Sequence, residues 1–378
     1  WLWWCILMGG LLSTFFYARL WRRADILTDV EFIELRYEGR SAAVLRVLLA
    51  VYGSVLKNAI IMGWVILAMA KVCDVLLGWN REWSIAIMIT IAVCYTLLSG
   101  FWGVVVTDVI QFVLAMGGSI ALMTIVLVKM GGPSGMVEQI QATEHFEPKV
   151  FHMVPDWRTA GELAFWTFIA QISVQWWEKG QGDGYIVQRF FATRDEKHAV
   201  LASLWFNFAH YVLRPWPWIV VGLASLVFFP YVPGEDPELA YPHMIAEFLP
   251  TGIRGLMVAS LIAAFMSTMD TQLNWGASYL VNDVYKRFVN PHATETHYVL
   301  MSRLAMLMLV VLGALAAWQS DSVSGAWKYL ITLTAGVGFV GLLRWFWWRI
   351  NAWSEISALV SSVLVANGGA IMAVLDRM

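Results

Sequence analysis

Charged residues are scarce in this chain. Lys, Arg, Asp and Glu make up 14% of its 378 residues, against roughly a quarter in ordinary soluble proteins. Hydrophobic residues make up 59%, and the mean hydropathy is +0.64. A single soluble core of this size would leave much of that apolar surface in water. The composition therefore excludes an ordinary soluble domain and predicts an integral membrane protein.

The sequence lacks the usual signatures of several functional classes. The net charge of −2 offers no basic surface for nucleic acid. The three cysteines, Cys5, Cys73 and Cys94, lie in apolar runs without a CxxC pair, which favours core thiols over disulfides or metal ligands. No HExxH, G-x-S-x-G or G-x-x-x-x-G-K-[ST] motif occurs, so no enzyme is predicted. Nothing indicates an obligatory protein partner.

Long apolar runs are what the sequence has instead. A helix needs about 20 mostly apolar residues to cross a bilayer. Ten segments are predicted to do so: 1–20, 44–77, 83–99, 104–130, 160–190 (interrupted), 199–229, 254–282, 298–318, 327–347 and 353–375. Strict alternation of these spans puts most Lys and Arg clusters on one side, which is therefore predicted to be cytoplasmic. The expected location is the plasma (inner) membrane, in which the chain is multi-pass.

One predicted span is interrupted by polar residues and glycine. Residues 168–191 are apolar at both ends but have the sequence EKGQGDG between Trp177 and Tyr185. Irregular backbone at membrane depth survives only where protein or a water-filled cavity satisfies its polar groups. A helix broken in this way is typical of a transporter's binding site. The alternative is two helices joined by an ordinary loop.

The stretch AAFMSTMDTQLNW, residues 263–275, places many oxygen atoms inside an apolar segment. At helical spacing Ala264, Ser267, Thr268 and Thr271 share one face, and Asp270 lies beside it. Hard cations prefer oxygen ligands, and an intramembrane carboxylate is a functional candidate by default. The pattern favours an ion site. Hydrogen bonding between helices is the alternative reading.

Two further charged residues lie in apolar surroundings. Asp108 and Gln111 are one turn apart near the start of the segment 104–130, where Asp108 is either a buried carboxylate or a helix cap at the membrane surface. Lys57 is a third buried-charge candidate and is expected to pair with a carboxylate.

Other polar and aromatic residues are candidates for lining a solute path. Asn207, His210 and Arg214 recur at i, i+3 and i+7 on an aromatic-rich segment that contains two prolines. Gln175, Trp176 and Trp177 precede the interruption and suit a hydroxylated solute. A structural role inside the membrane is an equally common explanation for a lone His or Arg.

Four segments of this chain resemble the sodium:solute symporter family. They are YTLLSGFWGVVVTDVIQ (95–111), GYIVQRFFATRDEKHA (184–199), RGLMVASLIAAFMSTMDTQLNWGASYLVNDVYKRF (254–288) and RWFWWRINAWSEI (344–356). The resemblance implies an all-α, LeuT-like fold with two inverted five-helix repeats in a single transmembrane domain. The first repeat would occupy roughly 1–130, the second roughly 158–350, and an extra helix 353–375. The chain starts at Trp1, inside an apolar segment, and is expected to be a fragment that lacks the first core helix.

The same resemblance implies specific sodium ligands. Ala264, Ser267 and Thr268 match the family's main sodium site. Asp108 matches an aspartate that binds a second sodium in some members. Asp270 and Thr271 stand where those members have hydroxyls, so here a carboxylate replaces one hydroxyl.

The function expected from these observations is sodium-coupled symport, with Na⁺ as the coupling ion and a small organic solute such as a sugar or sugar acid as cargo. Two alternatives remain open at this point: a transporter-like sensory module, and a symporter coupled to protons through Asp270 or Asp108. No partner beyond the solute and the lipid bilayer is expected.

Overall fold

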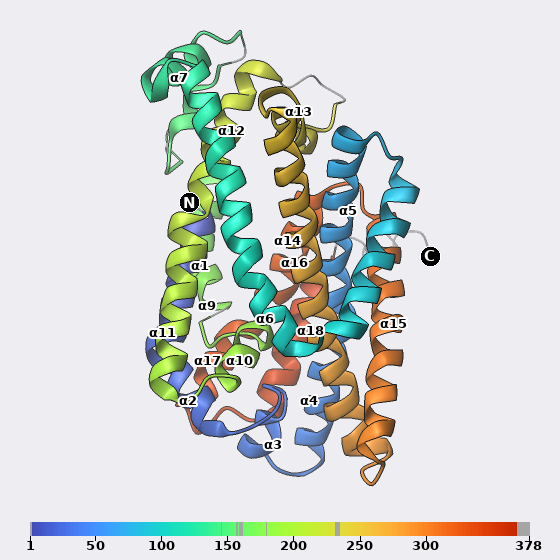
Figure 1. Cartoon of the computed structure of the whole chain (residues 1–378). Helices are drawn as coiled ribbons and strands as arrows, with labels where there is room; N and C mark the ends of the chain where they lie inside the picture. Colours follow the sequence, from blue (N-terminus) through green and yellow to red (C-terminus); the bar gives the residue numbers. More distant parts are fainter. Residues whose placement is uncertain are drawn as a thin grey trace, which may run out of the picture.

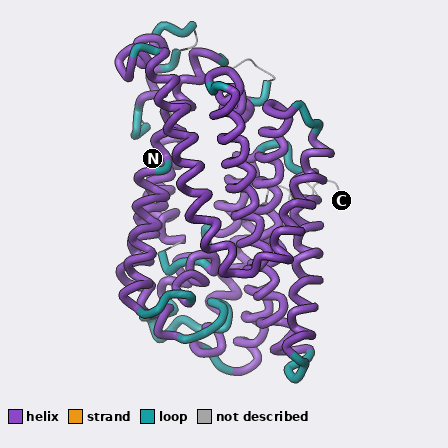
Figure 2. Tube along the Cα trace, in the orientation of Figure 1, coloured by secondary structure: helices purple, strands orange, loops and turns teal. Residues whose placement is uncertain are grey.

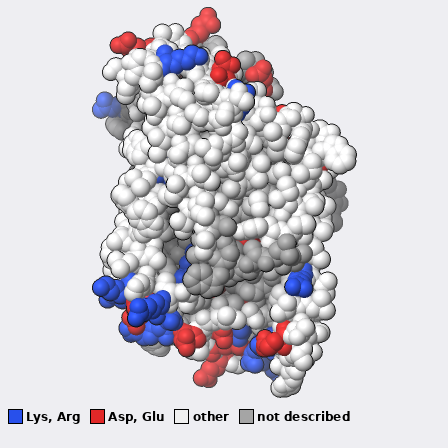
Figure 3. Space-filling view, in the orientation of Figure 1, with Lys and Arg blue, Asp and Glu red and all other residues white. Residues whose placement is uncertain are grey.

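The computed structural model describes residues 2–144, 146–155, 158, 162–178, 180–230 and 235–368. Within these ranges all regular elements are helices, most of them packed side by side along one direction (Figures 1 and 2). Charged side chains gather at the two ends of the visible face and leave a largely uncharged band between them (Figure 3). This distribution is expected of a bundle that crosses a bilayer.

The helices have the following bounds. The α-helices are α1 (Leu2–Leu12), α2 (Ala18–Ala24), α3 (Phe32–Arg36), α4 (Gly39–Val51), α5 (Asn58–Leu77), α6 (Arg81–Lys129), α7 (Gly132–Gln141), α8 (Glu162–Ala170), α9 (Trp176–Glu178), α10 (Gly184–Phe191), α11 (Glu196–Asn207), α12 (Pro215–Phe228), α13 (Ala240–Phe248), α14 (Thr251–Ser278), α15 (Glu295–Gln319), α16 (Val323–Thr334), α17 (Val337–Leu343) and α18 (Ala352–Ala366). Wider π-helical turns form η1 (Ser13–Tyr17), η2 (Tyr52–Lys57), η4 (Gln171–Gln175), η5 (Phe208–Leu213) and η7 (Tyr279–Val289), and 3₁₀ turns form η3 (Pro148–Phe151) and η6 (Pro237–Leu239).

Most of the predicted spans correspond to helices of sufficient length. Six continuous helical stretches in the described residues are long and apolar enough to cross a membrane: Trp3–Ala24, Gly39–Leu77, Asp108–Lys129, Glu196–Phe228, Thr251–Val289 and Glu295–Gln319. The pair α16 and α17 forms a seventh, bent by 44°. The predicted span 353–375 is represented by α18, which has 15 residues, and residues 369–375 lie outside the described part.

The predicted break between the spans 83–99 and 104–130 is not a loop. The structure has one 49-residue helix, α6, which if straight would extend about 74 Å at 1.5 Å per residue. Figure 1 shows that its ribbon bends sharply partway, so that the two limbs run in different directions. The second limb contains Asp108–Lys129, which is long and apolar enough to cross a membrane, whereas the span 83–99 stays a prediction. A bend in a continuous helix joins the two limbs.

The predicted interruption at 160–190 is confirmed. Helical structure from α8 through α9 ends at Glu178, and α10 begins only at Gly184. Gly182 has φ +85°, a left-handed conformation that glycine adopts without steric cost. Asp183 then caps α10, because its side chain accepts a hydrogen bond from the backbone N–H of Ile186. Lys179 lies outside the described residues.

Small residues let α5 and α15 approach closely. A Cβ on Gly63 would lie 2.8 Å from the Cβ of Ala316, and one on Gly313 would lie 2.8 Å from the Cβ of Met62. Small residues at such contacts are typical of helix packing in membranes, where the bilayer supplies no hydrophobic drive for association. The paired helices α5 and α15 pack beside α14 and α6, which carry the candidate site.

Candidate functional site

The polar stretch of α14 faces the bent helix α6. Asp270 is completely buried. Its Oδ1 accepts a hydrogen bond from Asn274 Nδ2 at 2.9 Å, whereas its Oδ2 has no hydrogen-bond partner among the described residues. A buried carboxylate oxygen without a donor is costly unless a cation or a proton compensates it.

The structure brings Asp108 to the same place. Ser267 donates a hydrogen bond to Asp108 Oδ1 across the α6–α14 contact. Asp108 is also close enough to Asp270 for the two carboxylates to repel each other. The residues expected at two separate ion sites therefore form one continuous cluster.

The hydroxyls of the cluster keep oxygen atoms available for an ion. Thr268 Oγ1 donates to the carbonyl oxygen of Ala264 at 3.0 Å, which leaves the lone pairs of the hydroxyl free to act as ligands. Thr271 Oγ1 accepts a hydrogen bond from Arg189 Nη2 at 3.2 Å. The second half of the broken helix, α10, is thereby linked directly to the cluster.

Sequence reasoning missed two members of this cluster, Arg189 and Thr96. Arg189 lies in a recognised motif, but only the fold shows that it reaches Thr271. The Thr96 side chain approaches the Asp270 carboxylate from the first limb of α6. Among the described residues, Thr96 Oγ1 forms no hydrogen bond within 3.5 Å, and neither does Oε1 of Gln111 on the second limb. Several unsatisfied acceptor oxygens around two carboxylates fit a hard cation such as sodium.

A large cavity borders this cluster, with Ala264 common to both. It encloses about 750 Å³ and is lined mainly by aromatic and aliphatic side chains, including Trp3, Trp64, Trp218 and Trp327. Ala264 and Arg214 also lie on its wall. Ligand sites are typically concave, largely apolar and roughly 300–1,000 Å³ in volume, so the cavity is suited to an organic molecule.

At one end of this large cavity, Glu238 anchors the loop before α13. It pairs with Lys71 and accepts hydrogen bonds from Ser322 Oγ and from the backbone N–H groups of Val323 and Ser324. These contacts tie η6 to α5 and to the start of α16.

The Glu238 anchor should make stability depend on acid pH. Burial alone would raise the pKa of Glu238, but the bond from Lys71 and the three others lower it from 4.5 to about 2. A depressed pKa means that the stabilisation is complete above pH 4.5 and is lost as the pH falls toward 2. Thermal unfolding of the protein and of Glu238→Gln should therefore differ most above pH 4.5, and the difference should shrink below it. A difference that stays constant over this range would contradict the assignment.

The predicted polar stripe of Asn207, His210 and Arg214 does not lie in one environment. Arg214 lines the large cavity, contacts His210 Nδ1 at 3.1 Å and lies 4.6 Å above the ring of Trp218. Asn207 instead donates to Thr14 Oγ1 at 3.1 Å and to the Gly10 carbonyl at 3.3 Å, so it packs against the first span.

Trp176 and Trp177, which were predicted to line a solute path, do not line the large cavity. The rings of Trp176 and Trp177 stack 4.1 Å apart, and Trp177 meets Phe339 edge-on at 5.8 Å. Neither ring is among the residues that line the large cavity. The side chain of Gln175 lies outside the described residues. A role for these three residues in solute binding stays a prediction.

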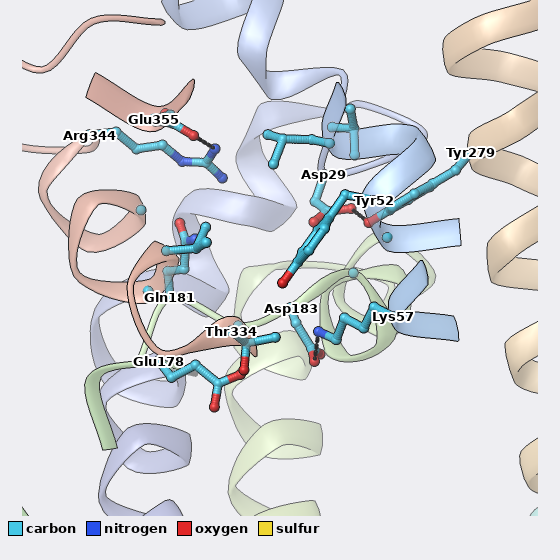
Figure 4. A pocket seen from close by; sticks show the side chains of 18 of the residues that line it. Asp29, Tyr52, Lys57, Glu178, Gln181, Asp183, Tyr279, Thr334, Arg344 and Glu355 are labelled. Atoms are coloured by element: carbon cyan, nitrogen blue, oxygen red, sulfur yellow. Dashed lines mark hydrogen bonds and ion pairs between the residues drawn. The ribbon is translucent and has the colours of Figure 1, made fainter. Parts of the chain in front are cut away.

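A smaller polar cavity of about 120 Å³, the inner cavity, lies toward the loop before α3 (Figure 4). Lys57 pairs there with Asp183 of the broken helix at 3.2 Å, which confirms the expected carboxylate partner. Arg344 pairs with Glu355 at 3.2 Å, and Tyr279 donates to Asp29. Burial raises the pKa of Asp29, although the bond from Tyr279 and the charge of Arg344 oppose the rise.

Comparison with known proteins finds several cotransporters that are similar to this chain. The model of the sodium:solute symporter family matches residues 1–363. The chain is 28% identical to a sodium/mannose cotransporter of Bos taurus, over 92% of this chain and 63% of that protein. It is 25% identical to a sodium/glucose cotransporter of Vibrio parahaemolyticus, over 89% and 65%, and 24% identical to a high-affinity proline transporter of Bacillus subtilis, over 78% and 61%. The chain thus spans less than two thirds of the length of these relatives.

A solved structure has the same fold. The substrate-bound, outward-open form of a Na⁺-coupled sialic acid symporter superposes with a TM-score of 0.72 at 19% sequence identity, covering 97% of this chain and 83% of that one. The expected LeuT-like, all-helical fold is therefore confirmed.

Proposed function

Because the chain belongs to the sodium:solute symporter family, we propose that its helices carry a small organic solute across the plasma membrane together with sodium. The observation that carries this proposal is the oxygen cluster between α6 and α14. Among the described residues, Asp270 Oδ2 is buried and accepts no hydrogen bond, although the Thr96 side chain approaches this carboxylate. Asp108 is nearby, and Ala264 lies on the wall of the large cavity. A cation bound there would lie next to a solute in that cavity.

Sodium would bind at two adjoining positions within the cluster. Ala264, Ser267 and Thr268 would supply a carbonyl and two hydroxyls to the first ion. Asp108, Asp270 and Thr271 would supply ligands to the second, with Thr96 and Gln111 close by. These assignments join the family resemblance to the unsatisfied oxygens described above.

The contacts of the cluster explain how ion binding would be coupled to solute transport. Sodium would hold α14 against α6 and, through Thr271 and Arg189, would fix the position of α10. A solute in the large cavity would favour the same arrangement of helices. Two ligands that stabilise one conformation increase each other's affinity. The carrier would therefore change between its outward-facing and inward-facing conformations with both ligands bound.

Removing either hydroxyl of the first site should weaken sodium binding. Ser267→Ala and Thr268→Ala should each raise the sodium concentration needed for half-maximal thermal stabilisation by roughly 10- to 150-fold, because a lost contact to a charged group costs about 1.5–3 kcal/mol. The measurement is thermal unfolding of the protein reconstituted in liposomes, titrated with sodium and, separately, with potassium.

Ser260→Ala is the matched control, because Ser260 lies on the same helix and its hydroxyl only bonds to the Leu256 carbonyl. It should keep the normal sodium response. Stabilisation by sodium and potassium alike would contradict a sodium site. A response to pH without any response to sodium would instead assign the cluster to protons, which the buried Asp270 makes the second candidate.

A further inference from the structure

Arg214 is a cation that has no carboxylate counter-ion among the described residues. It precedes α12 directly, and none of the described carboxylates lies within 4.0 Å of its guanidinium group. By contrast, Arg46, Lys57 and Lys71 each pair with a carboxylate. The groups around Arg214 are the His210 ring nitrogen, the face of Trp218 and the nearby phenol of Tyr185, none of which is a carboxylate.

The contact with His210 shows how little of the guanidinium group is satisfied. Its Nη1 donates to His210 Nδ1 at 3.1 Å, so Nδ1 acts as the acceptor. A guanidinium group has five N–H donors, and this contact occupies one of them. The cation–π contact with Trp218 returns about 0.5–2 kcal/mol, less than the cost of burying an unpaired charge.

The surroundings of Arg214 leave that charge uncompensated. The same cavity wall includes Glu238, but this carboxylate pairs with Lys71, which also pairs with Asp236 at 2.6 Å, and neither carboxylate is within 4.0 Å of Arg214. The other lining residues are mainly aromatic and aliphatic. Ala264, the expected sodium ligand, lies on the wall as well, but the carboxylates of the adjoining cluster, Asp108 and Asp270, would offset the charge of a bound sodium ion.

We infer that the transported solute is an organic acid whose carboxylate binds Arg214, an inference that rests on the proposed function for the identity of the cavity as the solute site. A carboxylate accepts two parallel hydrogen bonds from a guanidinium group and neutralises it. The body of the solute would lie against Trp3, Trp64, Trp218 and Trp327. A neutral sugar would fill the same volume but would leave the arginine unpaired, which selects against it.

Matched pairs of probes test this inference. Glucuronate is compared with glucose, and benzoate with benzyl alcohol, in thermal unfolding of the reconstituted protein with sodium present. Each acid should raise the unfolding temperature more than its neutral partner. Arg214→Gln should require an acid concentration about thirtyfold higher or more for the same shift, since it leaves the carboxylate unpaired. Arg214→Lys should retain part of the response.

The stability of the ligand-free variants separates binding from structure. Arg214→Gln removes an uncompensated charge, so without solute it should unfold at a higher temperature than the unmodified protein. An arginine with a purely structural role would show the opposite. Arg254→Gln is the control, because Arg254 donates to the Leu249 carbonyl and does not line the cavity. It should leave the acid response unchanged.

The outcomes separate this inference from the proposed function. Equal responses to acid and neutral partners, no response to either acid, or an unchanged acid response in Arg214→Gln would each overturn it. A sodium response without an acid response would support sodium coupling and contradict an acid solute. An acid response without a sodium response would support Arg214 as an acid site and contradict sodium coupling.

Discussion

Asp283→Asn should lower the free energy of unfolding by about 3–5 kcal/mol, the usual effect of breaking a buried ion pair. Asp283 is completely buried, and Arg46 donates to its Oδ1 from Nε at 2.9 Å and from Nη2 at 2.6 Å. Thr28 Oγ1 donates to its Oδ2 at 2.8 Å. The substitution removes the negative charge and leaves the Arg46 guanidinium with Glu34, a carboxylate that it shares with Arg287, as its remaining ion-pair partner among the described residues.

The large effect is expected because Asp283 joins three segments. It lies on η7, Arg46 on α4, and Thr28 in the loop before α3. Arg46 also bonds Glu34, which in turn accepts from Arg287 at the surface. Loss of the central carboxylate therefore loosens the helices that close one end of the inner cavity.

Two variants make the Asp283 experiment specific. Arg287→Gln removes only the exposed arm of the network and should change stability by less than about 1 kcal/mol. The double variant Arg46→Met with Asp283→Leu replaces both charges by apolar groups and should recover most of the lost stability, as buried pairs often do. Thermal unfolding in detergent measures all four proteins. A double variant as unstable as Asp283→Asn would show that the pair acts through geometry and not through charge.

Asp108→Asn and Asp270→Asn should each raise the sodium concentration for half-maximal stabilisation by about thirtyfold or more, because each removes one charge from a desolvated ion site. The two carboxylates repel each other and surround unsatisfied oxygens, an arrangement that a cation relieves. The slope of the sodium titration should also fall toward that of a single ion. Titration by thermal unfolding, with potassium as the comparison ion, measures both effects.

Asp270→Ser is the informative companion to this prediction. It restores the hydroxyl that the family resemblance places at this position and keeps an oxygen ligand, so sodium should bind better than in Asp270→Asn. Asp74→Asn, an exposed carboxylate near the end of α5, should have no effect. Sodium binding that survives in Asp108→Asn and Asp270→Asn would confine the ion to the Ser267 and Thr268 hydroxyls.

Local sequence patterns predicted several features of this site correctly. A polar face at helical spacing placed Ser267, Thr268, Asp270 and Thr271 on one helix, because side chains three or four residues apart share a face whatever the helix packs against. Three glycines within five residues predicted the break before α10, because glycine weakens a helix in any surroundings. Lys57 was recognised as a buried charge because its neighbours are apolar.

Partners across the fold could not be predicted in this way. Asp183 for Lys57, Asp283 for Arg46 and Arg189 for Thr271 lie more than eighty residues away in every case. The two limbs of α6 were predicted as the separate spans 83–99 and 104–130, since composition does not distinguish a bent helix from two helices. That bend is what brings Thr96 beside Asp270.

Composition and helical periodicity were enough to predict a helical membrane protein with a broken helix and an oxygen-rich stripe, because both depend on a few neighbouring residues. The folded chain was needed to show that Ser267 meets Asp108, that the two expected ion sites adjoin, and that Arg214 faces the large cavity without a carboxylate among the described residues. Those outcomes depend on how distant helices pack, and packing sets which charges meet a partner inside the membrane.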